Sequence, residues 1–248
     1  MKTNIQRAIV LFHTLCLIGI NAFAQGVYWE SKISSSNTEK ERTDKAYYMP
    51  KMLKVVHGED GTSAIIRLDK EMMMMIDPSE KSYWEVTFAE MERFMKGASA
   101  EMEAQMEQMP EEQRKMVEQM MGSRMKKEPK VETVKTGESK TISGFSCTKY
   151  LVKQDGKEEA TVWATTDIRK FEVMQKDIEE FARRMKAMMP PGATDATGLV
   201  GGIDGFPIQT ETSGGWKNVV TKIEERSTPA NEFEPPSGYR KTDPPMMR

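Results

Sequence analysis

The sequence holds very little of the side-chain chemistry on which most enzymes and metal sites depend. Its 248 residues include only two cysteines and two histidines. His13 and Cys16 lie in an apolar N-terminal stretch, which leaves His57 and Cys147 in the rest of the chain. One cysteine cannot form an internal disulfide, and a lone thiol is typically a small buried hydrophobe. A catalytic histidine needs an orienting partner and a reacting group within reach, and no cysteine or second histidine lies near His57 in the sequence.

Recognisable functional motifs and an excess of positive charge are also missing. The sequence contains no phosphate-binding loop, no Gly-x-Ser-x-Gly elbow, no zinc spacing and no calcium loop. Its 36 basic and 38 acidic residues give a formal net charge of −2. An evenly mixed surface argues against a nucleic-acid partner and against electrostatic membrane binding. We therefore expect a protein that is not an enzyme and has no cofactor and no metal ion.

The N-terminus has the pattern of a cleavable export signal. Lys2 and Arg7 precede an apolar run over residues 8–20, and Ala22 and Ala24 stand at the positions of small residues before a cut. The run is too short to span a bilayer, so we expect no transmembrane span. We predict cleavage after Ala24 and a periplasmic or otherwise exported protein with a net charge of −4. An uncleaved N-terminal anchor is the alternative.

A hairpin within Val134–Thr165 is the strongest local signal in the chain. Two strand-like runs, Ser146–Lys153 and Glu159–Thr165, flank the pair Asp155-Gly156. An Asp-Gly pair between alternating runs favours a type I′ turn, because both central residues of that turn need positive φ.

Period-two alternation predicts more strands on either side of this hairpin. The charged stretch Asn37–Lys45 has no apolar period and is predicted to be a loop, and the proline-rich tail from Ser227 is predicted to be extended or disordered near its end. The additional predicted strands are Gly26–Ser36, Met52–His57, Ser63–Asp69, Met72–Asp77, Ser82–Phe88, Lys130–Glu138, Thr141–Ile142, Phe206–Ser213 and Trp216–Arg226.

Two regions have helical periodicity. From Phe88 to Lys127, methionines recur mostly at spacings of three, four or seven, which predicts two helices meeting near Met109-Pro110. A third helix is predicted over Ile168–Met189 with Asp167 as its N-cap. Its apolar stripe contains Phe171, Met174, Ile178, Phe181 and Met185.

Several segments resemble an uncharacterised family of exported bacterial domains that is similar to the lipoprotein-carrier (LolA-like) superfamily. The segments are MMMMIDPSEKSYWEV, GESKTISGFSCTKYLV with ATVWAT, GFPIQTE and EFEPPSGYR. The resemblance implies a mainly β (α+β) fold, a curved antiparallel half-barrel sheet with helices covering the concave face. In that superfamily the cavity holds acyl chains or other apolar cargo. We therefore expect a signal peptide over 1–24, a single LolA-like domain over 25–241 with a Met-rich helical insertion at about 88–127, and a disordered tail over 242–248.

The 22 methionines have three interpretations. They form an adaptable apolar groove, or they capture copper(I) as soft ligands, or they fill the helix-to-sheet interface. Two features count against copper: His57 is the only histidine outside the leader, and a strand at Met72–Met75 would send neighbouring side chains to opposite faces.

The leading hypothesis is an exported, monomeric, non-enzymatic carrier or binding protein for a hydrophobic or acylated ligand, such as a lipid or the acyl chain of a lipoprotein. The alternatives are a soft-metal sequestering protein and a structural or interaction domain with a partner protein in the cell envelope. Alternation and helix faces select a set of candidate cavity-lining residues: Ile66, Leu68, Met73, Met75, Trp84, Val86, Met95, Met102, Tyr150, Val152, Phe181 and Met185.

Overall fold

The computed structural model describes residues 26–36, 38–116, 130–188 and 202–245. Its strands form one sheet in the order β12-β6-β5-β4-β3-β2-β1-β11-β10-β9-β8-β7. All the pairings are antiparallel except β12 with β6. The strands are β1 Val27–Ser35, β2 Thr38–Met49, β3 Met52–Val56, β4 Ser63–Arg67, β5 Met72–Asp77, β6 Ser82–Thr87, β7 Val131–Ile142, β8 Phe145–Gln154, β9 Lys157–Thr165, β10 Phe206–Thr212, β11 Trp216–Glu225 and β12 Arg240–Lys241.

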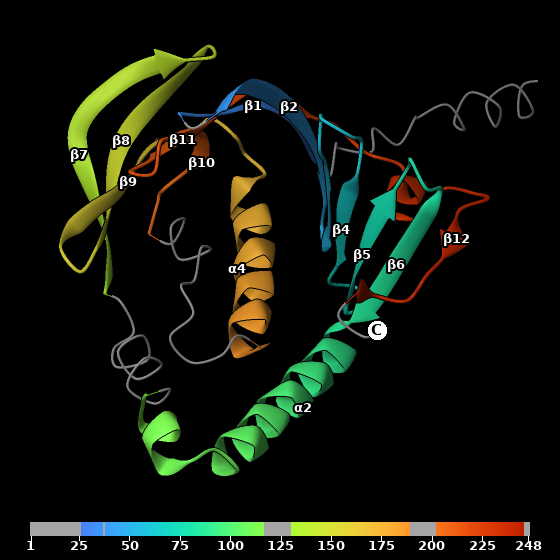
Figure 1. Ribbon diagram of the computed structural model, residues 1–248. Helices are drawn as coiled ribbons and strands as arrows, with labels where there is room; N and C mark the ends of the chain where they lie inside the picture. The colour runs from blue at the N-terminus through green and yellow to red at the C-terminus, as the bar shows by residue number, and fades with distance from the viewer. Residues whose placement is uncertain (1–25, 37, 117–129, 189–201, 246–248) are drawn as a thin grey trace, which may run out of the picture.

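The sheet curves into an arch, and helix α4 (Phe171–Met188) lies inside its concavity (Figure 1). Helix α2 (Phe88–Glu107) leaves the end of β6 and crosses the open side of the arch. The predicted fold, a curved antiparallel half-barrel with helical cover on the concave face, is therefore confirmed. The predicted signal peptide lies outside the described residues. Within the described ranges, no helix has the length and apolar character needed to cross a bilayer.

The predicted central hairpin is present as β8 and β9. Asp155 and Gly156 have φ values of 51° and 84° at its turn, which is the left-handed geometry that the Asp-Gly pair predicts. The preceding turn, between β7 and β8, uses Ser143 and Gly144 in the same way, with φ values of 50° and 86°. Local turn chemistry therefore fixes the register of three consecutive strands.

The prediction of a loop over Asn37–Lys45 is wrong, because β2 covers Thr38–Met49. Thr38 and Arg42–Lys45 of β2 pair with β1 through the backbone. Arg42, Thr43 and Lys45 are exposed, so no apolar period is required there. Backbone pairing with a neighbouring strand forms a strand even where the side chains carry no alternation.

The helices also differ in detail from the prediction. Helix α2 begins with a capping box in which the Thr87 hydroxyl accepts from the Glu90 backbone N–H while the Glu90 carboxylate accepts from Thr87. Residues 111–116 are again helical, with the Arg114 N–H donating to the Pro110 carbonyl at 3.0 Å, as the proline predicted. Helix α4 begins at Phe171, so the predicted start at Ile168 with Asp167 as N-cap is wrong. The remainder of the Met-rich stretch, 117–129, lies outside the described residues.

A C-terminal segment packs on the convex face of β3–β6, and the sequence pattern did not predict this packing. The short 3-10 helix η3 (Ala230–Phe233) inserts Phe233, whose side chain is 0% exposed, against Ile65, Met74 and Ile76. The Arg67 guanidinium attaches this segment to the sheet by donating to the Phe233 carbonyl at 3.3 Å and to the Glu234 carboxylate. The same guanidinium donates to both Asp69 carboxylate oxygens at 2.8 and 2.7 Å. We call residues 229–241 the C-terminal strap.

Truncation of Phe233 should therefore test the strap directly. Phe233→Ala leaves a cavity in a fully buried site and should lower the free energy of unfolding by about 3–5 kcal/mol. The measurement is urea denaturation followed by circular dichroism. Phe94→Ala is the control, because Phe94 is 37% exposed on α2 and its loss should cost clearly less than the loss of the fully buried Phe233. Equal effects of the two substitutions would contradict the docked strap.

Candidate ligand-binding site

The concave core is built where α4 meets the middle of the sheet. Phe171 and Met174 of α4 are buried in one cluster with Val27, Tyr48 and Val220. The rings of Phe171 and Phe206 meet edge to face with centroids 5.7 Å apart, and Phe206 meets Trp29 in the same way at 5.6 Å. Such pairs stabilise a core beyond the area they bury. The stripe predicted for this helix is the face that it presents to the sheet.

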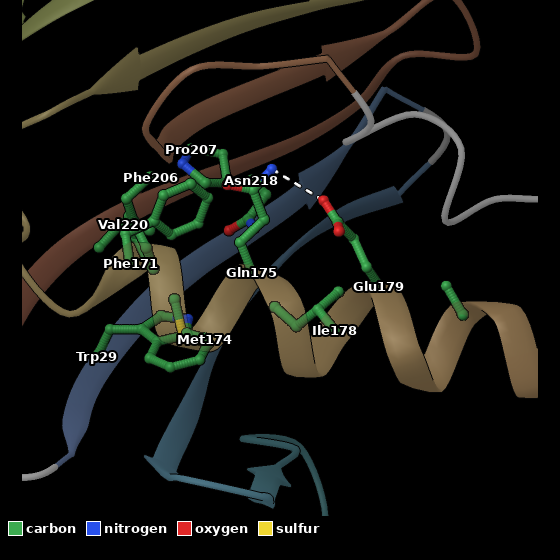
Figure 2. Close-up of a pocket in the computed structure, with 11 residues that line it drawn as sticks. Trp29, Phe171, Met174, Gln175, Ile178, Glu179, Phe206, Pro207, Asn218 and Val220 are labelled. Carbon is green, nitrogen blue, oxygen red and sulfur yellow. Dashed lines mark hydrogen bonds between the residues drawn. The ribbon is translucent and has the colours of Figure 1, made fainter.

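An apolar cavity of about 250 Å³ opens on one side of α4 and is called here the β1-side cavity (Figure 2). The helix provides one wall, and β1, β10 and β11 provide the other. Most of its lining is aromatic or aliphatic, and its polar side chains are Gln175, Glu179 and Asn218. The full lining is Trp29, Phe171, Met174, Gln175, Ile178, Glu179, Ala182, Phe206, Pro207, Asn218 and Val220.

A second apolar cavity, of about 230 Å³, lies on the opposite side of α4 and is called the β3-side cavity. Ile178 borders both cavities, so the helix divides the concave face into two compartments. The lining of the second cavity is Tyr48, Lys51, Met52, Leu53, Ile66, Leu68, Asp177, Ile178 and Phe181.

Polar groups fasten α4 to the sheet on the β3 side. The buried Asp177 carboxylate accepts from the Tyr48 hydroxyl at 2.7 Å and from the Lys51 backbone N–H at 2.7 Å. Lys51 Nζ lies 3.1 Å from Asp177 and 2.5 Å from Glu180. Arg184 then joins Glu180 at 2.9 Å to Glu71 at 3.2 Å. We call these residues the α4 clamp.

The clamp has clear electrostatic consequences. Burial, together with the hydrogen bond to Asp177, raises the pKa of the Tyr48 hydroxyl, so Tyr48 stays a neutral donor. Hydrogen bonds from Lys51 and Arg184 lower the pKa of Glu180, which keeps this carboxyl charged. The clamp is therefore a network of hydrogen bonds and ion pairs whose members partner one another, and it holds the helix in place.

Three of the predicted lining residues come together at the β3-side cavity: Ile66, Leu68 and Phe181. Four others, Met73, Met75, Trp84 and Val86, continue the same sheet face, since the register pairs Ile66 with Met73 and Met73 with Val86. They line neither cavity.

The five remaining predicted residues also lie away from both cavities. Tyr150 and Val152 are buried in a separate cluster closed by Ile203. Met185 is half-buried on α4, and Met95 is half-buried on α2. Met102, further along α2, is 44% exposed.

Sequence reasoning missed most of the β1-side lining, although signals for it existed. Phe171, Met174 and Ile178 were in the predicted helical stripe but were not selected as cavity residues. Trp29, Phe206 and Val220 all belong to predicted strands, and they approach α4 only because β1, β10 and β11 are neighbours in the sheet. That long-range pairing is not encoded in any local pattern.

The methionines of β5 and Cys147 pack within the fold. Met72 and Met74 lie on the face of β5 that packs under Phe233, so the run Met72–Met75 is divided between two faces of the sheet. Cys147 is fully buried, and burial raises the pKa of its thiol, which disfavours the reactive thiolate. Among the described residues, no three His, Cys, Asp or Glu side chains gather as a metal site.

A larger hollow of about 690 Å³ lies near the turn end of the β1–β2 hairpin. Its lining is mostly polar or charged, and it includes Lys40, Glu41, Arg42 and Glu59. This composition does not suit an apolar chain, so the candidate site is the pair of cavities beside α4.

Comparison with known proteins identifies the family of this chain. Residues 109–239 match the profile described as Domain of unknown function (DUF4412), which is more than half of the 248 residues. The chain belongs to this family. The match includes α4, β7–β11 and η3, and thus one wall of both cavities. It agrees with the predicted membership of an uncharacterised family. No curated protein matches the DUF4412 chain.

Solved structures resemble the DUF4412 chain at low identity. An uncharacterized conserved protein from Thermus thermophilus has a TM-score of 0.47 at 6% identity, over 89% of this chain and 91% of that one. PNGF-II has a TM-score of 0.40 at 9% identity, over 89% and 31%. MucB in the Pseudomonas aeruginosa MucA/MucB complex has a TM-score of 0.38 at 8% identity, over 86% and 58%. The chain thus spans about a third of PNGF-II and little more than half of that MucB chain.

The α4 clamp predicts a specific pH dependence of stability. The pKa of Glu180 is lowered from 4.5 in the folded state, so its charge contributes stability above 4.5 that is lost as the pH falls through the lowered folded value. Glu180→Gln should cost up to about 1 kcal/mol of unfolding free energy at neutral pH, and this difference should vanish in strong acid. Urea denaturation across the acidic range measures it.

Glu179→Gln is the matched control, since Glu179 accepts a hydrogen bond from Gln175 and takes no part in the α4 clamp. Its difference from the wild type should be small at every pH. A Glu180→Gln difference that persisted unchanged into strong acid would contradict the charge-based clamp.

Proposed function

We propose that this protein is an exported, non-enzymatic binding or carrier protein for a hydrophobic or acylated ligand, such as a lipid or the acyl chain of a lipoprotein, in the periplasm. The observation that carries the proposal is the pair of apolar cavities that flank α4 on the concave face of the sheet. The N-terminal pattern of basic, apolar and small residues supports export.

The cavities have the composition of a ligand site. Small-molecule sites are concave and mostly apolar with a few polar groups, and they typically have volumes of about 300–1,000 Å³. Volumes of about 250 and 230 Å³ lie just below this range, so each cavity suits a single short chain or part of a longer one. Burial of each methylene contributes about 0.8 kcal/mol to the free energy of binding, so a chain that fills the cavity binds most tightly.

The charges around the cavities favour binding over chemistry. The charged side chains that line them are Glu179, Lys51 and Asp177, and the last two are paired with each other. A general base needs a reacting group in reach, and a nucleophile needs an activating neighbour. Cys147 is buried with a raised thiol pKa, and His57 lines neither cavity.

The exposed face of α2 supports a second candidate, an interaction domain of the cell envelope. Phe94 and Met102 are more than a third exposed on this helix, as is Met109 just beyond its end. A self-associating form predicts an increase in mass with concentration in size-exclusion chromatography with light scattering. A constant monomer mass would contradict that form.

A series of straight-chain alcohols should test the binding proposal quantitatively. Affinity measured by isothermal titration calorimetry should rise about fourfold for each added methylene, about 0.8 kcal/mol, until the cavity is full. Ala182→Phe places a ring in the β1-side cavity and should weaken binding roughly tenfold or more, at least about 1.4 kcal/mol.

Val173→Phe is the control for this experiment, because it adds the same ring to α4 at an exposed position outside both cavities. It should leave the affinity unchanged. Failure of every alcohol to bind would overturn the proposal. Native mass spectrometry of the protein from a periplasmic extract then tests whether an acylated ligand accompanies it.

A further inference from the structure

The β1-side cavity contains a hydrogen-bond acceptor that the protein leaves unused. Asn218 projects from β11 into the lining beside Gln175 of α4 (Figure 2). Its side-chain oxygen Oδ1 is buried, and no donor within the described part of the chain reaches it. Buried polar atoms in native structures nearly always have a partner, so an orphan acceptor in a cavity wall indicates a missing donor.

The other polar groups of the cavity do not fill this role. Gln175 donates one of its two Nε2 hydrogens to the Glu179 carboxylate at 3.1 Å, and its amide makes no hydrogen bond to Asn218 Oδ1. Asn218 therefore faces a wall whose remaining members are aromatic and aliphatic. An acceptor in such surroundings gains most from a donor that arrives with an apolar ligand.

The charges of this cavity discriminate between head groups. Among the described residues, no Lys, Arg or His belongs to its lining, and the one ionisable side chain there is the carboxylate of Glu179. A carboxylate or phosphate head group would meet like charge and no counter-ion. An ammonium head group would be attracted to the exposed Glu179 carboxylate, and at Asn218 it would have to lose its water shell for a neutral partner, which is costly in an apolar site.

We propose that the β1-side cavity selects single-chain amphiphiles whose uncharged head group carries a hydrogen-bond donor, such as a fatty alcohol or a primary fatty amide. The chain lies among Trp29, Phe171 and Phe206, and the head group donates to Asn218 Oδ1. This inference rests on the proposed function and names the chemical class of its ligand. The LolA-like resemblance, which concerns acyl chains in general, does not supply it.

The test compares four probes with the same chain on the purified protein at neutral pH: decanol, decanamide, decyl methyl ether and decanoate. Calorimetric titration should show decanol and decanamide binding about tenfold more tightly than the ether, which lacks the donor. Decanoate, which is ionised and lacks a donor, should bind more weakly than decanol. The ether has an additional methyl group, so hydrophobicity alone would give the opposite order.

Two variants locate the effect. Asn218→Leu should reduce the preference for decanol over the ether to about twofold or less, while the ether still binds and reports an intact cavity. Glu179→Gln, at an exposed position where folding is not at risk, should raise decanoate affinity several-fold relative to that of decanol. If Asn218→Leu does not fold, Asn218→Ala makes the same comparison with less bulk.

The outcomes separate the two proposals. If no probe binds, the proposed function itself fails. If all probes bind but the ether equals decanol, or decanoate binds as tightly as decanol, the head-group inference is overturned and the binding function stands. A preference for decanol that survives in the Asn218 variant would likewise overturn the role assigned to this side chain.

Discussion

The attachment of α4 to the concave face is the constraint on which the rest of this structure depends. A single open sheet has two faces, and each needs a cover wherever it is apolar. On the concave face that cover is one helix, whose buried side chains Phe171 and Met174 complete the central cluster. Without it, Tyr48, Val27 and Val220 would face water together. The two cavities exist because a single helix is narrower than the arch that it covers.

The two sides of this helix are held differently. On the β3 side, Asp177 accepts two hydrogen bonds and the ion pairs of Lys51, Glu180 and Arg184 follow in succession. On the β1 side, contact is made by rings and aliphatic groups, and the Asn218 acceptor is unpaired within the described part of the chain. A satisfied polar network resists rearrangement, whereas an apolar wall adapts to a chain at little cost. The asymmetry therefore favours the β1 side as the place where a ligand is received.

Much of the fold was predictable, because most of its strands are joined by short turns with local signatures. Asp155-Gly156 specifies a type I′ turn, and alternation places the runs on either side of it. β2 was missed because its pairing with β1 makes it a strand while its side chains carry no apolar period. The strap was missed because Phe233 stands alone in a proline-rich stretch, where one buried ring gives no periodicity.

The candidate site was harder to predict than the fold. Alternation selected the correct sheet face at Ile66 and Leu68, and helical spacing selected Phe181. Neither pattern shows where along the sheet the helix lies, so Met73, Met75 and Trp84 were chosen from strands that α4 does not cover. Trp29, Phe206 and Asn218 come from distant parts of the sequence and meet through the order β1-β11-β10. The site therefore depends on the order of the strands in the sheet, which no local sequence pattern shows.

The structure shows which side chains of the methionine-rich helix α2 contribute to the core. Phe88 and Met91, in its first turn, are buried, and the Phe88 ring lies 6.2 Å from that of Phe181 on α4. Beyond that turn the helix moves away from the sheet, and Phe94 and Met102 face outward. Of its four methionines, Met91 is buried, Met95 and Met106 are half-buried, and Met102 is exposed. Because the described residues that line the cavities belong to α4, the strands and their turns, the proposed ligand-binding role is separable from the role of α2.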